Sequence, residues 1–474
     1  MTPNRPTRRT VLIAGGATAA AAAAAAGAGL LQGCSPSHRS DDRPPDESAW
    51  PITIPGTKAP GRPVRAGDGI YSASTGAVLR AFDVTTGARR WSTTLRRIDS
   101  PGLGDPNAPD GKDVRVTDPT VVGNLVVTTV TWADTGILVA VDIKTGREVW
   151  RWKPSEPRHA PQLQPRYDNG LLLTTSGPVP PEPADTGQDT GQDTLRAFDP
   201  ATGKEVWNYS RPRYRGFSWE AHRDAFVVTD SATDLVVGLH ARTGDVLWTR
   251  RSTGSPVGVY GKAMLMVNAA EPGGAAAPSS EKTQVTSITA ATGEVIWSKR
   301  VPGATRVRGG RLFAQTDEAL SALEAATGRT LWSRKMRRLP GTSDDGDLIT
   351  KDLWCLRDSS SDREQDPDSY TPDSTTRVIA LDVRTGHQAW AVTVPRGSAH
   401  PRAITKETVY VAAPQQEGHG TDEALYSVDV RDGSIRWKRR VPQASAPEPE
   451  GTRVLITAYA HADVLDRDTG VPVR

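Results

Sequence analysis

Phe82-Asp83-Val84-Thr85-Thr86-Gly87-Ala88-Arg89-Arg90-Trp91 is the stretch that decides the fold, because its arrangement of residues recurs along the chain. Gly87 comes four positions after Asp83, and Trp91 comes four positions after Gly87. The same spacing of glycine and tryptophan is found at Gly146 and Trp150, Gly203 and Trp207, Gly244 and Trp248, Gly293 and Trp297, Gly328 and Trp332, Gly386 and Trp390, and Gly433 and Trp437. Eight of the thirteen tryptophans thus occupy one fixed place in a repeat, which is typical of a repeat architecture.

Each repeat unit has the pattern of a β-hairpin. An alternating segment such as Leu195-Arg196-Ala197-Phe198 precedes the turn, as in a half-buried strand. The aspartate before the turn can accept backbone N–H bonds, and the glycine supplies the positive φ that a short hairpin loop needs. Five of the eight units have aspartate at this place, and the other three have Glu324, His240 and Thr289. The second strand carries the tryptophan and often ends in proline, as at Pro302 and Pro395, which suits a strand end.

Further strand-like runs lie upstream of each hairpin. Examples are residues 125–129, 171–173, 225–228 and 409–411. Each period of roughly 35 to 59 residues therefore holds about four strands, which predicts an all-β propeller built of four-stranded antiparallel blades. We expect the tryptophan of each blade to fill the gap between neighbouring sheets.

The two ends of the repeat region predict how the propeller closes. Residues 50–55, beginning with Trp50, match the tryptophan strand but have no turn before them. Residues 464–470 match the turn but have no tryptophan after them. Pairing these two half units would join the first and last blades and remove two open sheet edges.

The repeat resembles that of pyrroloquinoline-quinone (PQQ)-dependent dehydrogenases and their non-enzymatic relatives, which include the outer-membrane assembly lipoprotein of Gram-negative bacteria. The resemblance covers most of residues 50–474, and it places the chain with PQQ-like β-propellers of the non-enzymatic branch. Such propellers usually have eight blades, which is the expectation here. Counting eight complete units and the split one allows nine. The assembly role is not carried over, because it depends on an outer membrane that the sequence does not indicate.

The first 34 residues have the features of an export signal. Arg8 and Arg9 precede an Ala-rich apolar run, as in a twin-arginine signal peptide. The run ends at a lipobox-like segment in which Cys34 would be lipidated, although Gln32 stands where a smaller residue is usual. Residues 35–49 are polar and predict a flexible tether, followed by a single propeller domain over residues 50–474. An uncleaved transmembrane anchor and plain secretion are the alternatives, and all three place the domain outside the cytoplasm.

Composition excludes some classes of function. The net charge is only +3, which argues against nucleic acid as a partner. Two cysteines, Cys34 and Cys355, cannot form a disulfide framework. Cys355 lies in an apolar run and is interpreted as a buried, inert thiol.

Insertions and charge suggest where a binding surface lies. Four polar insertions fall between the second and third predicted strands of their blades: residues 178–194, 271–282, 359–376 and 415–423. A fifth, residues 101–118, lies between blades, so all five share one face. These loops carry acidic residues, namely Glu182, Asp185, Asp189, Asp362, Glu364, Asp366 and Asp368. The tryptophan strands and the residues after them are basic, at Arg89, Arg90, Arg96, Arg97, Arg250, Arg251, Lys299, Arg300, Arg334, Lys335, Arg337, Arg338, Lys438, Arg439 and Arg440. A binding face steered by charge and ordinary protection of strand edges are both consistent with this pattern.

No catalytic or metal-binding pattern is recognised. The resemblance implies that an enzymatic member would use adjacent cysteines, a bound calcium and an aspartate base. The chain has no adjacent cysteines, and its eight histidines show no metal-ligand spacing. We therefore assign no catalytic residue and no metal ligand, and expect no cofactor. The leading interpretation is a non-catalytic scaffold, lipid-anchored to the outer face of the cell membrane, that binds a protein or an envelope component. A PQQ- and calcium-dependent dehydrogenase with an atypical site, and an extracytoplasmic ligand-sensing module, are the alternatives.

Overall fold

The structure is a computed structural model that describes residues 52–53, 63–74, 77–95, 115–132, 135–155, 159–161, 164–178, 192–212, 217–230, 235–251, 254–268, 282–302, 304–315, 319–335, 348–358, 375–395, 399–414, 422–442, 446–458 and 461–473. The chain divides into two compact units, Met1–Pro45 and Asp46–Arg474, and every described residue belongs to the second. Strands and turns account for the secondary structure of these residues. No helix in this part of the chain has the length and apolar character needed to cross a membrane.

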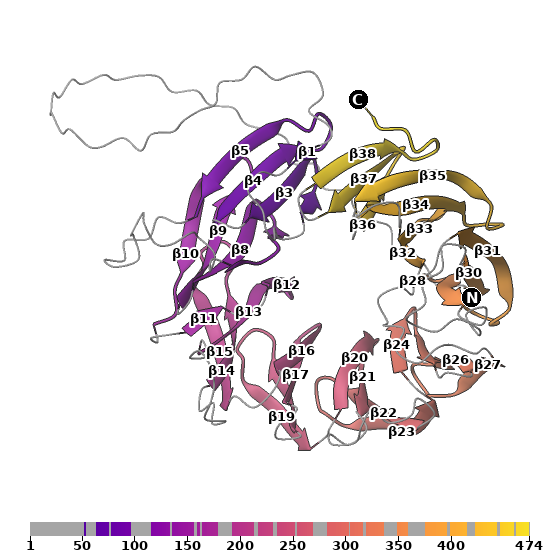
Figure 1. Ribbon diagram of the computed structural model, residues 1–474. Coiled ribbons are helices and arrows are strands. Elements are labelled where there is room, and N and C mark those ends of the chain that lie inside the picture. The colour runs from indigo at the N-terminus through magenta and orange to yellow at the C-terminus, as the bar shows by residue number, and fades with distance from the viewer. Residues whose placement is uncertain are drawn as a thin grey trace, which may run out of the picture. The chain divides into compact units, whose positions relative to one another are not determined.

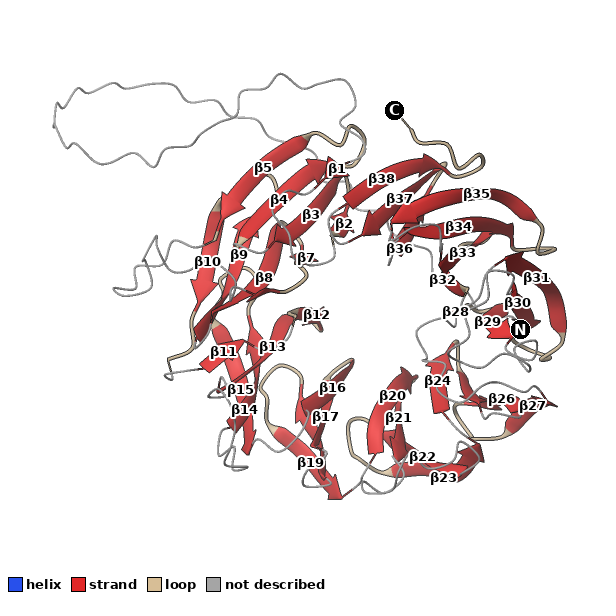
Figure 2. Cartoon of the chain, viewed as in Figure 1, coloured by secondary structure: helices blue, strands red, loops and turns tan. Residues whose placement is uncertain are grey.

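The described residues form nine antiparallel sheets, called blades 1 to 9 here, which follow one another along the chain (Figures 1 and 2). Blade 1 contains β2 (Val64–Ala66), β3 (Gly69–Ser74), β4 (Val78–Asp83) and β5 (Arg89–Thr94). Blade 2 contains β6 (Arg115–Val116), β7 (Thr120–Val122), β8 (Leu125–Trp132), β9 (Thr135–Asp142) and β10 (Glu148–Trp152). Blade 3 contains β11 (His159–Pro161), β12 (Arg166–Asp168), β13 (Leu171–Pro178), β14 (Gln192–Phe198) and β15 (Glu205–Pro212). In blades 2 and 3 the innermost place is shared by two short strands that pair with the same neighbour.

Blades 4 to 8 each have four strands in sequence order. Blade 4 contains β16 (Phe217–His222), β17 (Ala225–Asp230), β18 (Leu235–His240) and β19 (Val246–Arg251). Blade 5 contains β20 (Gly254–Tyr260), β21 (Ala263–Asn268), β22 (Lys282–Thr289) and β23 (Val295–Pro302). Blade 6 contains β24 (Ala304–Arg308), β25 (Arg311–Gln315), β26 (Ala319–Glu324) and β27 (Thr330–Lys335). Blade 7 contains β28 (Leu348–Ile349), β29 (Leu353–Asp358), β30 (Thr375–Asp382) and β31 (Gln388–Pro395). Blade 8 contains β32 (His400–Ile404), β33 (Thr408–Pro414), β34 (Asp422–Asp429) and β35 (Ile435–Pro442).

Blade 9 is made from both ends of the domain, as the two half units predict. Its strands β36 (Ala446–Glu450), β37 (Arg453–Ala458) and β38 (His461–Asp466) are completed by β1 (Ile52–Thr53). Ile52 pairs with Ala462 and Thr53 with His461. Trp50 itself lies outside the described residues. The predicted all-β propeller of four-stranded blades is confirmed, and of the two blade counts the structure has nine, the number of repeat units, where eight was expected.

The turn of each unit is built as its sequence predicts. The glycines of the eight complete units have φ between 67° and 78°, a range that a side chain disfavours. In blade 1 the Oδ1 of Asp83 accepts hydrogen bonds from the amides of Thr85 at 2.8 Å and Thr86 at 2.9 Å. Where histidine replaces aspartate, the His240 ring nitrogen Nδ1 lies 3.0 Å from the Thr243 hydroxyl. The turn is thus tied by a side chain in both versions.

Each repeat tryptophan bonds to the turn of the following blade. Its indole N–H donates to the carbonyl one residue after the aspartate position, at 2.7 to 3.0 Å, from Trp91 to Ile143, Trp150 to Pro200, Trp207 to Ala241, Trp248 to Ala290, Trp297 to Ala325, Trp332 to Val383, Trp390 to Val430 and Trp437 to Arg467. A Cβ on the turn glycine of that next blade would come within 3 Å of the same indole. We call this contact the tryptophan latch. The tryptophan that was expected to fill the gap between neighbouring sheets therefore also joins the two blades by a hydrogen bond.

Two local features make room for the latch. In each of the eight blades a register shift occurs on the tryptophan strand just before the tryptophan, as between Glu148 and Trp150. A bulge of this kind re-aims the side chains around it. The residue paired with the tryptophan on the third strand is always small: Ala81, Ala140, Ala197, Gly238, Ser287, Ala322, Ala380 and Ser427. The indole therefore lies over its own sheet and reaches the next.

The apolar core lies between blades. One cluster joins Tyr71 and Trp91 of blade 1 to Val126 and Val139 of blade 2. Another joins Trp207 of blade 3 to Phe226 of blade 4, with their ring centroids 5.8 Å apart. Each blade thus buries its faces against two neighbours, as expected where sheets repeat around an axis.

We predict that the cost of adding a methyl group at a turn glycine depends on the tryptophan beside it. Gly146 and Gly451 both have positive φ, at 67° and 54°, so alanine at either costs about 1–2 kcal/mol in backbone strain. At Gly146 the Cβ would lie 2.6 Å from the Trp91 ring, whereas nothing lies within 4 Å at Gly451. Gly146→Ala should therefore lose about 1–3 kcal/mol more than Gly451→Ala, measured by urea denaturation. Equal losses of unfolding free energy in the two variants would show that the Trp91 ring does not exclude a methyl group at Gly146.

Candidate functional site

The insertions link the strand ends that the sequence predicts, and these strand ends share one side of the domain. Four connect the second and third strands of their blades, between β13 and β14, β21 and β22, β29 and β30, and β33 and β34. The fifth, residues 101–118, follows β5 and leads into blade 2, and its residues 115–116 form the strand β6 rather than a loop. We call this side the loop face, and the side with the Thr-Gly turns the turn face. The acidic residues expected on the insertions, from Glu182 to Asp368, lie outside the described residues, as do Arg8, Arg9 and Cys34 of the export signal.

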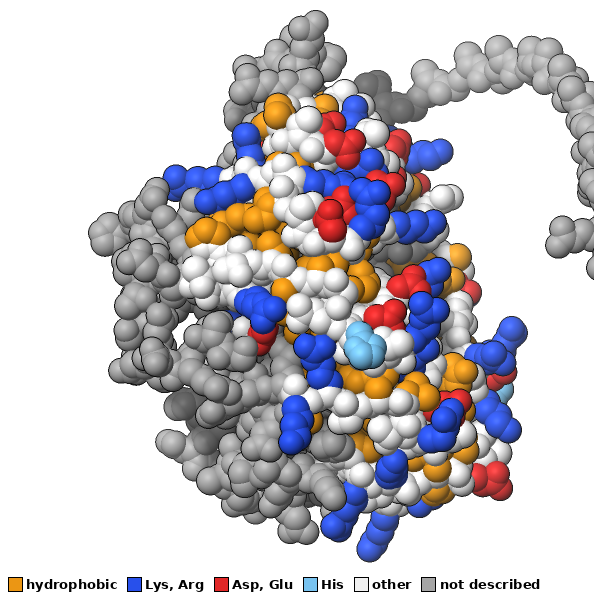
Figure 3. All heavy atoms as spheres, turned by 90° about the vertical axis from the view of Figure 1, so that its right-hand side faces the viewer, with side chains coloured by type: hydrophobic (Ala, Val, Ile, Leu, Met, Phe, Trp, Pro, Cys, Tyr) orange, Lys and Arg blue, Asp and Glu red, His pale blue; other side chains and the backbone are white. Residues whose placement is uncertain are grey.

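The basic residues that follow the tryptophan in blades 4 to 6 fall into two groups. The residue two positions after the tryptophan reaches the next blade, where Lys299 donates to the Gly328 carbonyl at 3.0 Å. Arg250 and Arg334 make the same contact with the carbonyls of Gly293 and Gly386, at 3.4 and 3.3 Å. The next residue along the strand, Arg251, Arg300 or Lys335, is exposed. Figure 3 shows Lys and Arg side chains projecting among apolar and acidic ones on the side of the ring to the right in Figure 1.

In blade 1 a basic residue belongs to the turn. Arg90 lies 2.5 Å from the Asp83 carboxylate and 2.9 Å from that of Asp68. Burial by itself raises the pKa of Asp83, but hydrogen bonds from Arg90 and from the Thr86 and Thr85 amides outweigh it and lower the pKa to about 2. Arg90 therefore stabilises the turn of blade 1 and is not an unpaired charge on the surface.

Blade 8 has a similar arrangement. Asp429 is buried at 5 % exposure, and its carboxylate lies 2.9 Å from Arg431 and 2.6 Å from Arg436. The hydrogen bonds from these two arginines hold the pKa of Asp429 well below its ordinary value. Arg436 also donates to the Thr408 hydroxyl at 3.2 Å, so the pair ties the turn to the second strand of the blade.

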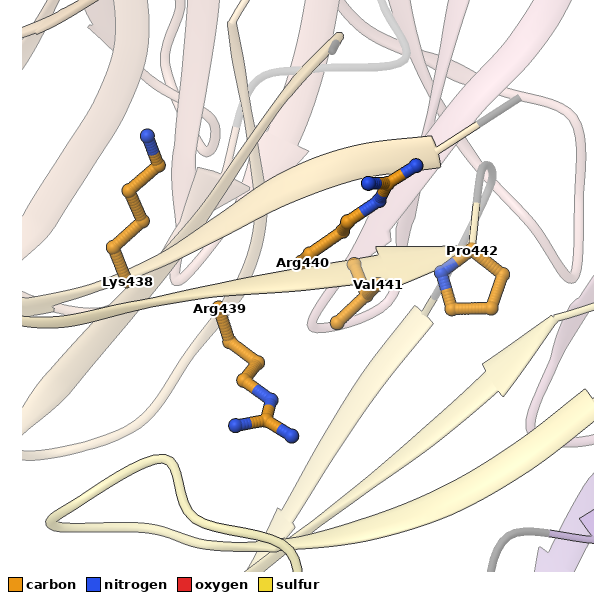
Figure 4. Close-up of a pocket in the computed structure, with 5 residues that line it drawn as sticks. All are labelled: Lys438, Arg439, Arg440, Val441 and Pro442. Carbon is orange, nitrogen blue, oxygen red and sulfur yellow. The ribbon is translucent and has the colours of Figure 1, made fainter. Parts of the chain in front are cut away.

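The outer strand of blade 8 lines a concavity of about 520 Å³. Its described lining residues are Lys438, Arg439, Arg440, Val441 and Pro442 of β35. Figure 4 shows Lys438 and Arg440 extending from one side of the strand and Arg439 from the other. The Lys438 ammonium lies 5.5 Å from the centroid of the Tyr426 ring, within the range of a cation–π contact. This part of the rim is strongly cationic and would attract an anionic group.

The innermost strands carry ion pairs that join neighbouring blades. Arg65 of β2 pairs with Glu450 of β36, across the junction between blades 1 and 9. Arg166 of β12 lies 3.8 Å from Glu220 of blade 4, with its guanidinium 4.3 Å above the Trp219 ring. Arg166 is also 3.5 Å from Asp168. Sequence reasoning missed these pairs, because residues on separate strands meet only once the ring is formed.

Comparison with known proteins identifies the family. A family profile described as outer membrane protein assembly factor BamB matches residues 39–177, 191–271, 234–362 and 374–472. The chain belongs to this family. No curated protein sequence matches it significantly.

Solved structures share the fold of this BamB-family propeller at low identity. A eukaryotic initiation factor is similar with a TM-score of 0.52 and 11 % identity, covering 88 % of this chain and 96 % of that one. BamB from Moraxella catarrhalis has a TM-score of 0.42 and 15 % identity, covering 86 % and 98 %. A europium-containing methanol dehydrogenase has a TM-score of 0.43 and 12 % identity, covering 88 % and 85 %.

The described residues lack two features that the enzymatic resemblance implies for a quinone and calcium site. That site needs adjacent cysteines, and the sequence has only Cys34 and Cys355. Cys355 is fully buried in β29, where it pairs with Ala380 and Leu348, as expected of an inert thiol. Within the described ranges no group of three His, Cys, Asp or Glu side chains is placed to hold a metal ion.

We predict that the turn carboxylates make the fold sensitive to acid. The pKa values of Asp83, Asp142, Asp382, Asp429 and Asp466 are all lowered in the folded chain. Their stabilising effect is present above the unfolded pKa, ordinarily 3.8, and is lost as the pH falls through the folded values. The melting temperature should therefore fall most steeply between about pH 4 and 2, as followed by circular dichroism.

Asp83→Asn is the matched variant for this measurement. The amide keeps an oxygen for the Thr85 and Thr86 amides but has no charge that titrates. The variant should be less stable at pH 7 and should show a shallower fall at low pH. A fall identical to that of the unaltered chain would exclude Asp83 as a contributor.

Proposed function

We propose that this protein is an exported, lipid-anchored propeller that acts outside the cytoplasm as a non-catalytic scaffold for a protein or an envelope component. The observation that carries the proposal is the structural use of the repeat motif. The tryptophan of each complete unit joins its blade to the turn glycine of the next blade. The residues that define the family here hold the ring together, and a rigid ring with elaborated loops suits binding.

Family membership supports the same proposal. The matching profile is described as an assembly factor, a role based on contact with other proteins. Our proposal is limited to protein or envelope binding. It does not extend to outer-membrane assembly, because that role requires an outer membrane.

The location rests on the N-terminal sequence. Arg8 and Arg9 would direct export, and Cys34 would carry the lipid. One or two acyl chains hold a protein at a membrane surface without spanning it. Residues 35–49 would then tether the propeller close to the bilayer.

We predict that Cys34→Ala abolishes labelling by a radioactive fatty acid and shifts the protein out of the washed membrane fraction. Cys355→Ala is the control, since this thiol is buried in the propeller, and it should keep both the label and the membrane location. Lysines in place of Arg8 and Arg9 should cause unprocessed protein to accumulate inside the cell. Fatty-acid labelling that persists in Cys34→Ala would contradict lipidation at this residue.

We predict further that the full-length protein, purified in detergent, does not bind pyrroloquinoline quinone with or without calcium. Calorimetric titration measures this directly. Tight, calcium-dependent binding near one molecule per chain would overturn the non-catalytic proposal and direct attention to alcohol and sugar substrates.

A further inference from the structure

The outer strand of blade 4, β19, leaves both its backbone edge and a pair of apolar side chains exposed. β19 is the last strand in the order β16-β17-β18-β19, so the backbone N–H and C=O groups along its outer side have no neighbouring strand. Its first two residues, Val246 and Leu247, are 53 % and 43 % exposed. Such an exposed, apolar edge is a ready template for another strand.

Other outer strands carry features that protect an edge. β15, β23, β31 and β35 all end in proline, which cannot donate a ladder hydrogen bond. β27 ends in lysine, and in β5 two arginines take the places that Val246 and Leu247 have in β19. β19 contains neither proline nor lysine. β10 lacks both as well and exposes Val149 at 49 %, but Glu148 stands there at the place of Val246 and pairs with Arg151. β23 also exposes an apolar pair, Val295 and Ile296, but the strand ends at Pro302.

The charged residues of β19 are separated along the strand, with an acidic residue before its start and basic residues at its end. Asp245 stands just before the strand, the uncharged residues from Val246 to Thr249 follow, and Arg250 and Arg251 end it. Arg250 already donates to the Gly293 carbonyl of blade 5. Arg251 is exposed, and no carboxylate among the described residues pairs with it. An antiparallel strand laid beside β19 would therefore meet cationic groups at its start and apolar side chains at its end.

Blade 4 lies across the ring from blade 9, which contains the first described strand. The chain enters the propeller through β1 in blade 9, at the top of Figure 1, and β19 lies at the bottom. In a ring of nine blades, blades 4 and 5 are the farthest from blade 9 in either direction.

We propose that β19 binds an extended, acidic segment of a partner protein as a fifth, antiparallel strand of blade 4. Carboxylates near the start of the segment face Arg251 and Arg250, and apolar side chains near its end cover Val246 and Leu247. Main-chain hydrogen bonds would supply affinity and the side chains specificity, as in other cases of strand addition. A peptide fits better than a lipid surface, because it alone satisfies the row of backbone groups. This inference deepens the proposed scaffold function and rests on it.

The test uses the full-length protein in detergent and a fluorescent eight-residue peptide that begins with two glutamates and continues with alternating threonine and valine. We predict saturable binding with a Kd below about 1 mM. Arg251→Glu should weaken binding about fivefold, because an exposed attraction becomes a repulsion of similar size. A peptide with lysines in place of its glutamates should bind Arg251→Glu better than the unaltered protein.

Two further variants locate the site. Leu247→Glu should weaken binding at least about tenfold, since it removes apolar contact and adds repulsion. Arg300→Glu makes the same charge change at the matching position of blade 5 and should leave the Kd unchanged. No binding, or equal weakening by Arg251→Glu and Arg300→Glu, would overturn the assignment to β19. Either result would leave the scaffold proposal standing, because quinone titration and Cys34→Ala test that proposal separately.

Discussion

The tryptophan latch is the contact on which the rest of the structure depends. A four-stranded sheet with two apolar faces is not stable alone, and it must bury each face against a neighbour. The latch sets that neighbour's distance and angle, because the indole N–H of Trp207, for example, reaches one carbonyl, Ala241, at 2.9 Å. The positive φ of Gly244 lets the turn approach the ring, which a Cβ would meet at 2.8 Å. Directional hydrogen bonding and close packing thus act at the same joint, where apolar burial alone would leave the blade angle loosely defined.

A latch that joins only neighbours does not fix the number of blades. Each unit specifies its contact with the next, so the ring closes at the blade where the two chain ends meet. Here β1 completes blade 9 through two residue pairs, Ile52 with Ala462 and Thr53 with His461. This short strand is supported by the latch from Trp437 to Arg467 and by the ion pair between Arg65 and Glu450. Closure of the ring therefore combines strand pairing within blade 9, a tryptophan latch from blade 8 and an ion pair between the innermost strands of blades 1 and 9.

Most of this architecture could be predicted from sequence, because the latch leaves a periodic signal. The spacing of Gly87 and Trp91 recurs in eight units, and the two half units identify the ninth blade. The expectation of eight blades came from the resemblance, whereas the units themselves count nine. The small residue opposite each tryptophan, such as Ala81 or Gly238, was also visible two positions before the turn residue, but its meaning required the strand register. By contrast, the contact of Lys299 with Gly328 and that of Arg166 with Glu220 join different blades. The local sequence therefore could not show which charged side chains bind a neighbouring blade and which are exposed to solvent.

The difference between residues that join blades and residues that are exposed also decides where a partner can bind. The latch requires the tryptophan, the small residue opposite it and the following glycine, and in several blades it also uses the basic residue two positions later. The sequence at these positions is therefore constrained in every blade by the ring itself. Other positions on the outer strand are not part of the latch, among them the residue before the tryptophan and the one three after it. In β35 these are Arg436, held by Asp429, and Arg440. In β19 they are Leu247 and Arg251, both exposed. Blades of one design thus differ at their edges, so specificity for a partner can change at one blade without weakening the joints that hold all nine.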